Sequence, residues 1–253
     1  MLRPRLIPCL LVHKGGLVKT RQFGSPKYVG DPLNAVRIYN EKEVDELVVL
    51  DIDATVTGRE PDYTLISNLA AECRMPLCYG GGVKTVAQAE RIIGLGVEKV
   101  AISSAAVDNP DLIRGMAEVV GRQSVVVIID VKNGSEVYTH NGTRKSGFDA
   151  VELAHRAAEL GAGEIVVNSI DNDGVMKGYD LALIERIRNA VTVPLTALGG
   201  AGSLKDIGTL IDHFGIIGAA AGSLFVFKGV YRAVLISYPN RADKDALIAQ
   251  CQS

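Results

Sequence analysis

The sequence predicts one (β/α)₈ barrel domain spanning residues 1–253, and three observations lead to it. Eight short apolar runs alternate with longer amphipathic segments along the whole chain. The runs are continuous and rich in β-branched residues, as expected for parallel strands buried on both faces. The length is close to that of a typical single barrel, and the two halves of the chain repeat.

The predicted strands are each bounded by Gly, Pro or Asp. In chain order they are residues 5–12, 46–52, 76–80, 99–103, 124–130, 164–168, 194–198 and 216–221. Strands that alternate with helices imply parallel βαβ units, and eight such units in this length fit a closed barrel better than an open sheet.

Helix-start signals lie between the strands. Asp31 followed by Pro32 supplies a capping side chain and a proline for the first turn, and Asp108 to Pro110 suggests the same arrangement. Asp180 and Ser203 are predicted to cap two further helices.

The repeat is specific enough to predict two half-barrels. Glu164 lies 118 positions after Glu46, and Gly199–Gly200 lies 118 positions after Gly81–Gly82. Matched glycine pairs and matched glutamates at one offset are unlikely to arise by chance among valine-rich strands. The predicted halves are roughly residues 1–120 and 121–253.

The composition narrows the class of protein. Hydrophobic residues make up 47% and charged residues 22%, as in soluble globular proteins, and the net charge of −2 argues against nucleic-acid or anionic membrane partners. The four cysteines form no CxxC pair and no histidine lies near them at a ligand spacing, so we expect neither metal nor cofactor. Signal-peptide and membrane-span patterns are absent, which predicts a cytoplasmic protein.

Two glycine-rich turns predict a pair of phosphate sites. In a (β/α)₈ barrel, ligands bind where strands end, and glycines there let backbone N–H groups approach an anion. Each turn has a serine partner at the end of the next strand, and Asp173–Gly174 follows the sixth strand. The predicted phosphate and substrate residues at these turns are Gly81, Gly82, Ser103, Ser104, Asp173, Gly174, Gly200, Gly202, Gly222 and Ser223.

One ionisable residue ends the fifth strand. Asp130 follows five apolar residues, and a carboxylate at that position is costly unless it is used or paired, so we predict a general acid or base. The repeat places its partner at the end of the first strand, 119 positions earlier. That position is Leu11, which cannot transfer a proton.

Four charged residues begin predicted strands at the opposite end of the barrel. They alternate in sign, and facing one another they would form an ion-pair ring that plugs or gates the barrel floor. The residues are Arg5, Glu46, Lys99 and Glu164.

With these positions identified, the sequence resembles the cyclase subunit of imidazole glycerol phosphate synthase over nearly its whole length. The resemblance rests on motifs in register, among them IPCL (7–10), DELV (45–48), GGG (80–82), SSAAV (103–107), GAGEI (161–165), SIDNDG (169–174) and GGAG (199–202). It implies a class I glutaminase docked at the N-terminal face of the barrel and ammonia passing through the barrel core. It also implies that Lys19 binds phosphate and that the four floor residues form the ammonia gate.

Departures from the family pattern bear on the reaction. The second catalytic aspartate of the family falls on Leu11, and its usual arginine and threonine after the sixth strand are Asn172 and Val175. This combination resembles a diverged branch encoded with surface-polysaccharide genes, whose members are thought to supply ammonia for converting an acetamido sugar into an acetamidino sugar.

Three functions are therefore carried forward. The first is a lyase-type synthase subunit that uses channelled ammonia to aminate or amidinate a phosphorylated or nucleotide-linked sugar. The second is a genuine imidazole glycerol phosphate synthase cyclase of histidine biosynthesis, and the third is a non-catalytic conductor of ammonia that activates the glutaminase.

Overall fold

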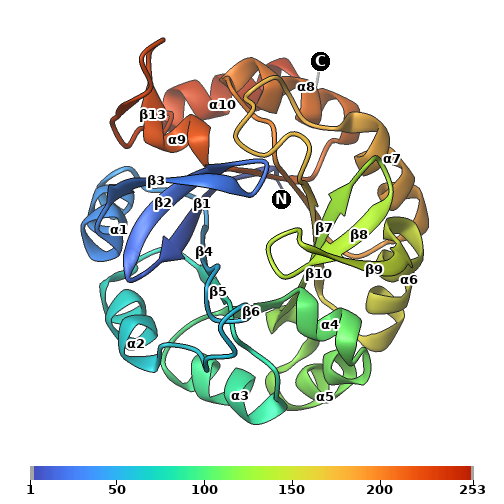
Figure 1. Cartoon of the computed structure of the whole chain (residues 1–253). Helices are drawn as coiled ribbons and strands as arrows, with labels where there is room; N and C mark the ends of the chain where they lie inside the picture. Colours follow the sequence, from blue (N-terminus) through green and yellow to red (C-terminus); the bar gives the residue numbers. More distant parts are fainter. Residues whose placement is uncertain (1–2, 252–253) are drawn as a thin grey trace.

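Eight parallel strands close into a barrel in the computed structural model, which describes residues 3–251 (Figure 1). The predicted domain extends beyond these residues only by positions 1–2 and 252–253. The barrel strands, in spatial order, are β1 (Arg5–His13), β4 (Leu47–Asp51), β5 (Leu77–Gly80), β6 (Lys99–Ile102), β7 (Val125–Lys132), β10 (Glu164–Ser169), β11 (Leu195–Leu198) and β12 (Gly218–Ala221). β12 pairs with β1, which closes the ring and confirms the predicted fold class.

Helices surround the barrel, as Figure 1 shows. They are α1 (Pro32–Glu41), α2 (Tyr63–Glu72), α3 (Val86–Gly94), α4 (Ser104–Asp108), α5 (Asp111–Val120), η1 (Arg122–Ser124), α6 (Ala150–Leu160), α7 (Leu181–Ala190), α8 (Leu204–Phe214), α9 (Ser223–Val226) and α10 (Arg241–Gln250). Leu6, Leu47 and Ile165 are among the residues of the main core, and a second core fills the barrel interior.

The capping predictions are confirmed at three helices and corrected at one. Asp31, Asp180 and Ser203 each accept a hydrogen bond from a backbone N–H in the first turn of the helix that follows. Asp108 instead ends α4, and α5 begins after Pro110 without a side-chain cap. The proline fits that position because its missing N–H would have no helical partner there.

Each half of the barrel carries an antiparallel extension that the sequence analysis did not predict. β1 continues into β2 (Gly16–Arg21) and β3 (Gly24–Gly30), and β7 continues into β8 (Glu136–Thr139) and β9 (Arg144–Asp149). A small hairpin of β13 (Phe227–Lys228) and β14 (Ala233–Val234) follows α9.

The two halves match in detail as well as in order. The N–H of Lys14, which follows β1, donates to Asp53 Oδ2 at 2.7 Å. The N–H of Asn133, which follows β7, donates to Asp171 Oδ2 at the same distance. Equivalent bonds at equivalent positions support the predicted half-barrel repeat, whereas the boundary near residue 120 stays a prediction. Within residues 3–251, no helix is both long enough and apolar enough to cross a membrane.

Candidate active site at the mouth of the barrel

Alternate residues of each barrel strand face the interior, so one strand leads from the floor to the mouth. On β1 this face carries Arg5 at the floor, then Ile7 and Cys9 in the interior core, and finally Leu11 in the pocket. The four floor charges and the glycine turns therefore lie at opposite ends of the barrel, as predicted.

The four floor charges form a closed ring. Lys99 Nζ lies 2.7 Å from Glu46 Oε1 and 2.8 Å from Glu164 Oε2. Arg5 bonds both glutamates from the other side, with Nη2 2.7 Å from Glu164 Oε1. Each cation thus bridges both carboxylates, and the ring carries no net charge.

Burial makes the charges of this ring costly in free energy unless each one is paired. Glu46 and Glu164 are only 3% and 5% exposed. Burial alone would raise the pKa of Glu164, but the charges of Arg5 and Lys99 outweigh it and hold that pKa well below its ordinary value. Thr196 donates its hydroxyl to Glu164 Oε1 at 2.6 Å. Thr196 thus helps to fix the ring, a role that the sequence analysis missed.

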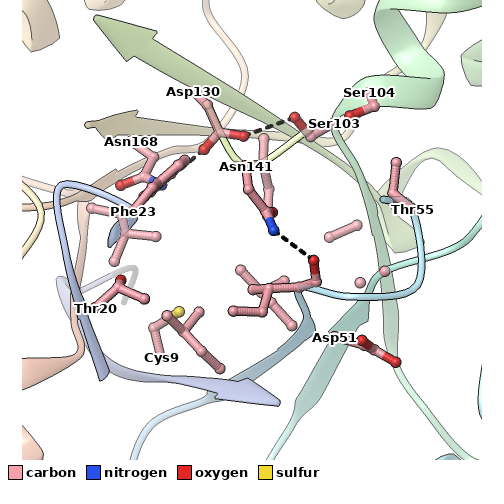
Figure 2. A pocket seen from close by; sticks show the side chains of 18 of the residues that line it. Cys9, Thr20, Phe23, Asp51, Thr55, Ser103, Ser104, Asp130, Asn141 and Asn168 are labelled. Atoms are coloured by element: carbon pink, nitrogen blue, oxygen red, sulfur yellow. Dashed lines mark hydrogen bonds between the residues drawn. The ribbon is translucent and has the colours of Figure 1, made fainter. Parts of the chain in front are cut away.

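A pocket occupies the mouth at the other end (Figure 2). Eight residues with predicted phosphate or substrate roles line it: Lys19, Gly81, Gly82, Ser103, Ser104, Asp173, Gly222 and Ser223. Asp130 lines it too, whereas the predicted residues Gly174, Gly200 and Gly202 are not among the residues that line it.

Among residues 3–251, only side chains donate hydrogen bonds to the Asp130 carboxylate. Ser103 Oγ donates to its Oδ2 at 3.0 Å, and Asn168 Nδ2 donates to its Oδ1 at 2.8 Å (Figure 2). Burial raises the pKa of Asp130 to about 6, although these two hydrogen bonds favour the charged form. A carboxyl group with that pKa can accept or release a proton near neutral pH.

Two other carboxylates line the pocket, but both accept hydrogen bonds from backbone N–H groups. Asp51 accepts the N–H groups of Asp53 and Ala54 at 2.9 and 3.1 Å. Asp173 accepts the Phe23 N–H at 3.3 Å and the Thr20 hydroxyl at 2.8 Å. Backbone donors fix both groups in turns, so Asp130 is the better candidate for proton transfer.

The remaining pocket base is apolar. Leu11, Leu50 and Leu198 line the pocket and pack against the interior core. Leu11 thus occupies the mouth position at which the repeat predicts a partner for Asp130, and it supplies no ionisable group there.

The glycine turns need close backbone approach. Gly81 has a φ of +119°, and a Cβ there would lie 2.3 Å from the Asp51 carbonyl oxygen. Gly200 has a φ of +111°, and its Cβ would lie 2.1 Å from the Gly178 carbonyl oxygen. A side chain is excluded at both positions, which explains the glycines by packing; phosphate binding by these turns stays a prediction.

Lys19 adds a buried positive charge beside Gly222, at the start of α9. It is 5% exposed, and its Nζ donates to the Cys9 carbonyl oxygen. A Cβ on Gly222 would lie 2.7 Å from that nitrogen, so the ammonium group reaches the start of α9. Burial lowers the pKa of Lys19, and no carboxylate among residues 3–251 forms an ion pair with it. A bound anion here would supply the missing counter-charge.

Asn168 was not predicted, although a signal for it exists in the sequence. It ends the apolar run of β10 as Asp130 ends that of β7, and the two residues pair in register. Its Oδ1 is buried and accepts no hydrogen bond from residues 3–251. The amide could therefore rotate to accept a proton donor at position 130 instead.

Asp130 should make stability depend on pH. Its pKa is about 6 in the folded protein and 3.8 ordinarily, so its contribution is full below about pH 4 and is lost as the pH rises through 6. We expect Asp130→Asn to be more stable than wild type by about 1–3 kcal/mol at pH 8, with little difference at pH 4. Urea unfolding at both pH values measures this.

Asp53→Asn is the matched control, because hydrogen bonds from Lys14 and His13 lower the pKa of Asp53 against the effect of burial. Its stability difference should have the opposite sign at pH 8. Equal stability of Asp130→Asn and wild type at pH 8 would contradict the raised pKa.

Comparison with known proteins gives a family and close relatives. The profile of the histidine biosynthesis protein family matches residues 5–232. A Leptospira interrogans protein, provisionally named imidazole glycerol phosphate synthase subunit HisF, is 59% identical over 252 residues, covering 98% of this chain and 99% of the relative.

Two further relatives are less similar to this chain; the name of the first is provisional, and that of the second is not. A Pseudomonas aeruginosa protein, provisionally named imidazole glycerol phosphate synthase subunit hisF2, is 54% identical over 244 residues, covering 95% of this chain and 97% of the relative. The imidazole glycerol phosphate synthase subunit HisF of Streptomyces griseus is 44% identical over 227 residues, covering 88% and 90%.

Proposed function

Because the chain belongs to the histidine biosynthesis protein family and is a HisF-type subunit, we propose that it takes ammonia from a class I glutaminase docked at the barrel floor and adds it to a phosphorylated or nucleotide-linked sugar. The relatives are named as subunits of imidazole glycerol phosphate synthase, which supports a two-protein assembly. The acceptor class is our own proposal, and Leu11 is the observation that carries it.

The floor and interior suit a small neutral molecule. Above the ion-pair ring, the barrel interior is lined by apolar and thiol side chains such as Val48, Cys78 and Val166. Charged species are costly in such surroundings, whereas neutral ammonia is not. The path ends at the pocket that contains Asp130.

The proposed chemistry uses one carboxylate. The acceptor is an amide of the sugar whose oxygen already carries an activating group. Ammonia forms a C–N bond to the amide carbon, the C–O bond breaks so that the oxygen leaves with its activating group, and Asp130 accepts the proton that the added nitrogen loses. Ser103 and Asn168 hold the carboxylate in place during this transfer. A cyclase that needs two cooperating acid–base groups lacks one here, because Leu11 takes the second position.

The two other functions make different predictions. A genuine histidine-pathway cyclase fits the family and the retained turns, and it requires robust turnover despite Leu11. A non-catalytic conductor fits the apolar pocket base, and it requires that the two-protein pair alone never transfers ¹⁵N from labelled glutamine to a sugar.

The phosphate sites offer a direct test of the proposed substrate class. Crystals soaked in inorganic phosphate should show one anion at the Gly81–Gly82 turn with Ser104. A second anion should lie at the Gly200–Gly202 turn with Ser223 and Lys19. Lys19→Met should abolish the second anion and leave the first, because it removes only the cation at that site. Empty density at both turns in wild-type crystals would count against a phosphorylated substrate.

A further inference from the structure

Two half-buried leucines lie across the pocket from Asp130. Leu11 on β1 and Leu50 on β4 pair in parallel register, as do Asp130 on β7 and Asn168 on β10. In the spatial order of the strands, β1 and β4 stand across the ring from β7 and β10 (Figure 1). All four side chains line the pocket, so an apolar pair faces a polar pair across it.

The half-barrel repeat relates the two pairs. Asp130 lies 119 positions after Leu11, and Asn168 lies 118 positions after Leu50. The repeat has therefore kept the pairing of the backbones, while the chemistry of the side chains differs between the halves. Proton transfer and hydrogen bonding by these positions are confined to the Asp130 side of the pocket, and the other side offers only hydrocarbon.

The two predicted phosphate sites lie between these sides. The first glycine turn follows β5 and the second follows β11, and these strands are opposite one another in the ring. β1 and β4 belong to one arc between them, and β7 and β10 belong to the other. A substrate with a phosphate at each turn would therefore have one edge toward Asp130 and the other toward the leucines.

The leucine surface is fixed and shallow. A Cβ on Gly80 would lie 2.9 Å from Leu50 Cδ2, so this leucine fills space that only a glycine leaves free. Below Leu11 and Leu50 on the same strand faces, Cys9 and Val48 are buried in the interior core. Apolar surface that lines a binding pocket is covered by an apolar part of the ligand, and here only a short group fits.

The reacting carbon of the proposed function has one substituent that can fill this space. The amide nitrogen leads back to the sugar between the two turns, and the activated oxygen leaves. Asp130 has to be close to the nitrogen that ammonia adds. The third substituent of the carbon then points toward the opposite side of the pocket, where Leu11 and Leu50 favour an alkyl group over a hydrogen atom or a polar group.

We propose that Leu11 and Leu50 form a subsite for the short alkyl group of an N-acyl sugar phosphate, and that this subsite holds the acyl carbon within reach of Asp130. The inference rests on the proposed function, because it assumes that the acceptor is an amide of a phosphorylated sugar. It adds that the acyl group is the part of the substrate that the leucines recognise. Leu11 then binds substrate at a position where an aspartate would transfer a proton.

Calorimetry of the full chain with three probes tests the subsite. The probes are N-formyl-, N-acetyl- and N-butanoylglucosamine 1-phosphate, which differ only in the alkyl group. Wild type should bind the N-acetyl probe about three- to fivefold more tightly than the N-formyl probe, the effect of burying one methyl group. The N-butanoyl probe should bind less tightly than the N-acetyl probe, because the surface is shallow.

Variants of two leucines locate the subsite. Leu50→Ala should reverse the preference, so that the N-butanoyl probe binds more tightly than the N-acetyl probe, because it opens room for a longer chain. Leu198→Ala is the matched control, since it removes the same atoms from the pocket base on β11, in the arc that contains β7 and β10. It should keep the wild-type order of affinities. Binding of inorganic phosphate shows that each variant is folded.

Three outcomes would overturn the proposal. If wild type binds the N-formyl and N-acetyl probes equally well, the subsite is wrong and the phosphorylated acceptor stands. If Leu50→Ala keeps the wild-type order, or Leu198→Ala reverses it, the alkyl group does not lie on the leucine pair. If wild type binds inorganic phosphate but none of the three probes, the N-acyl sugar phosphate is wrong as a substrate class, and the subsite falls with it.

Discussion

Replacing Lys99 with methionine is expected to uncouple glutamine hydrolysis from amination of the acceptor. Lys99 bridges Glu46 and Glu164 at 2.7 and 2.8 Å, so its loss opens one side of the floor ring and leaves it with a net negative charge. Ammonia can then escape to water or be held as ammonium. In the complex with the glutaminase, more glutamine should be hydrolysed per acceptor aminated, while turnover with added ammonium chloride is retained.

The stability of this variant needs a control of its own. Breaking a buried ion pair typically costs about 3–5 kcal/mol, because it leaves a charge without a partner. Lys99→Met combined with Glu46→Gln restores neutrality and should recover much of that loss while the ring stays open. Arg3→Met is the matched surface control, since it breaks only the exposed pair with Asp245, and it should keep normal coupling.

A wild-type ratio of glutamine hydrolysed to acceptor aminated in both ring variants would show that the ring is structural. Loss of ammonium-driven turnover would instead indicate damage to the mouth, at the far end of the barrel. The two results separate a gate from a structural plug.

The barrel could be predicted because its strands carry an unusually plain signal. Runs such as VVVIID, ending at Asp130, are continuous and apolar, and they recur at nearly constant spacing with a glycine or an acid at the end. The observed barrel strands begin and end within about two residues of the predicted bounds, which is the usual uncertainty at element ends.

The hairpins at the mouth carry no such signal. β3, with the sequence GSPKYVG, has no buried residue, and β9, RKSGFD, is likewise exposed or half-buried. Periodicity reports burial, so strands that lie over a pocket instead of in a core are invisible to it. The β2–β3 and β8–β9 hairpins were therefore found only in the structure.

Some residues of the site could likewise be predicted from the sequence, and others could not. Asp130 and the floor charges were predicted because an ionisable group in an apolar strand is costly and calls for an explanation. Asn168 and Thr196 are uncharged and ordinary in strands, and their importance comes only from the carboxylates that the fold places beside them. Strand register decides which side chains lie beside a predicted charge, and register cannot be read directly from the sequence.

The position of Leu11 is the observation that bears most directly on the proposed reaction. It lies on the interior face of β1 at the mouth, beside Leu50 in the parallel register with β4. Loss of one of two cooperating acid–base groups typically costs about 10²–10⁴ in rate. The retained turns and Lys19 would still bind a substrate with two phosphates.

The most direct measurement is therefore turnover of the imidazole glycerol phosphate synthase substrate with ammonium chloride, by wild type and by Leu11→Asp. We expect wild type to be a poor cyclase and Leu11→Asp to be faster by up to about 10²–10⁴, since it restores the second carboxylate. Leu50→Asp is the matched control, because it adds a carboxylate to the same pocket at the wrong position, and it should give no gain. Wild-type turnover as fast as that of Leu11→Asp would contradict the account and identify the chain as a working cyclase of histidine biosynthesis.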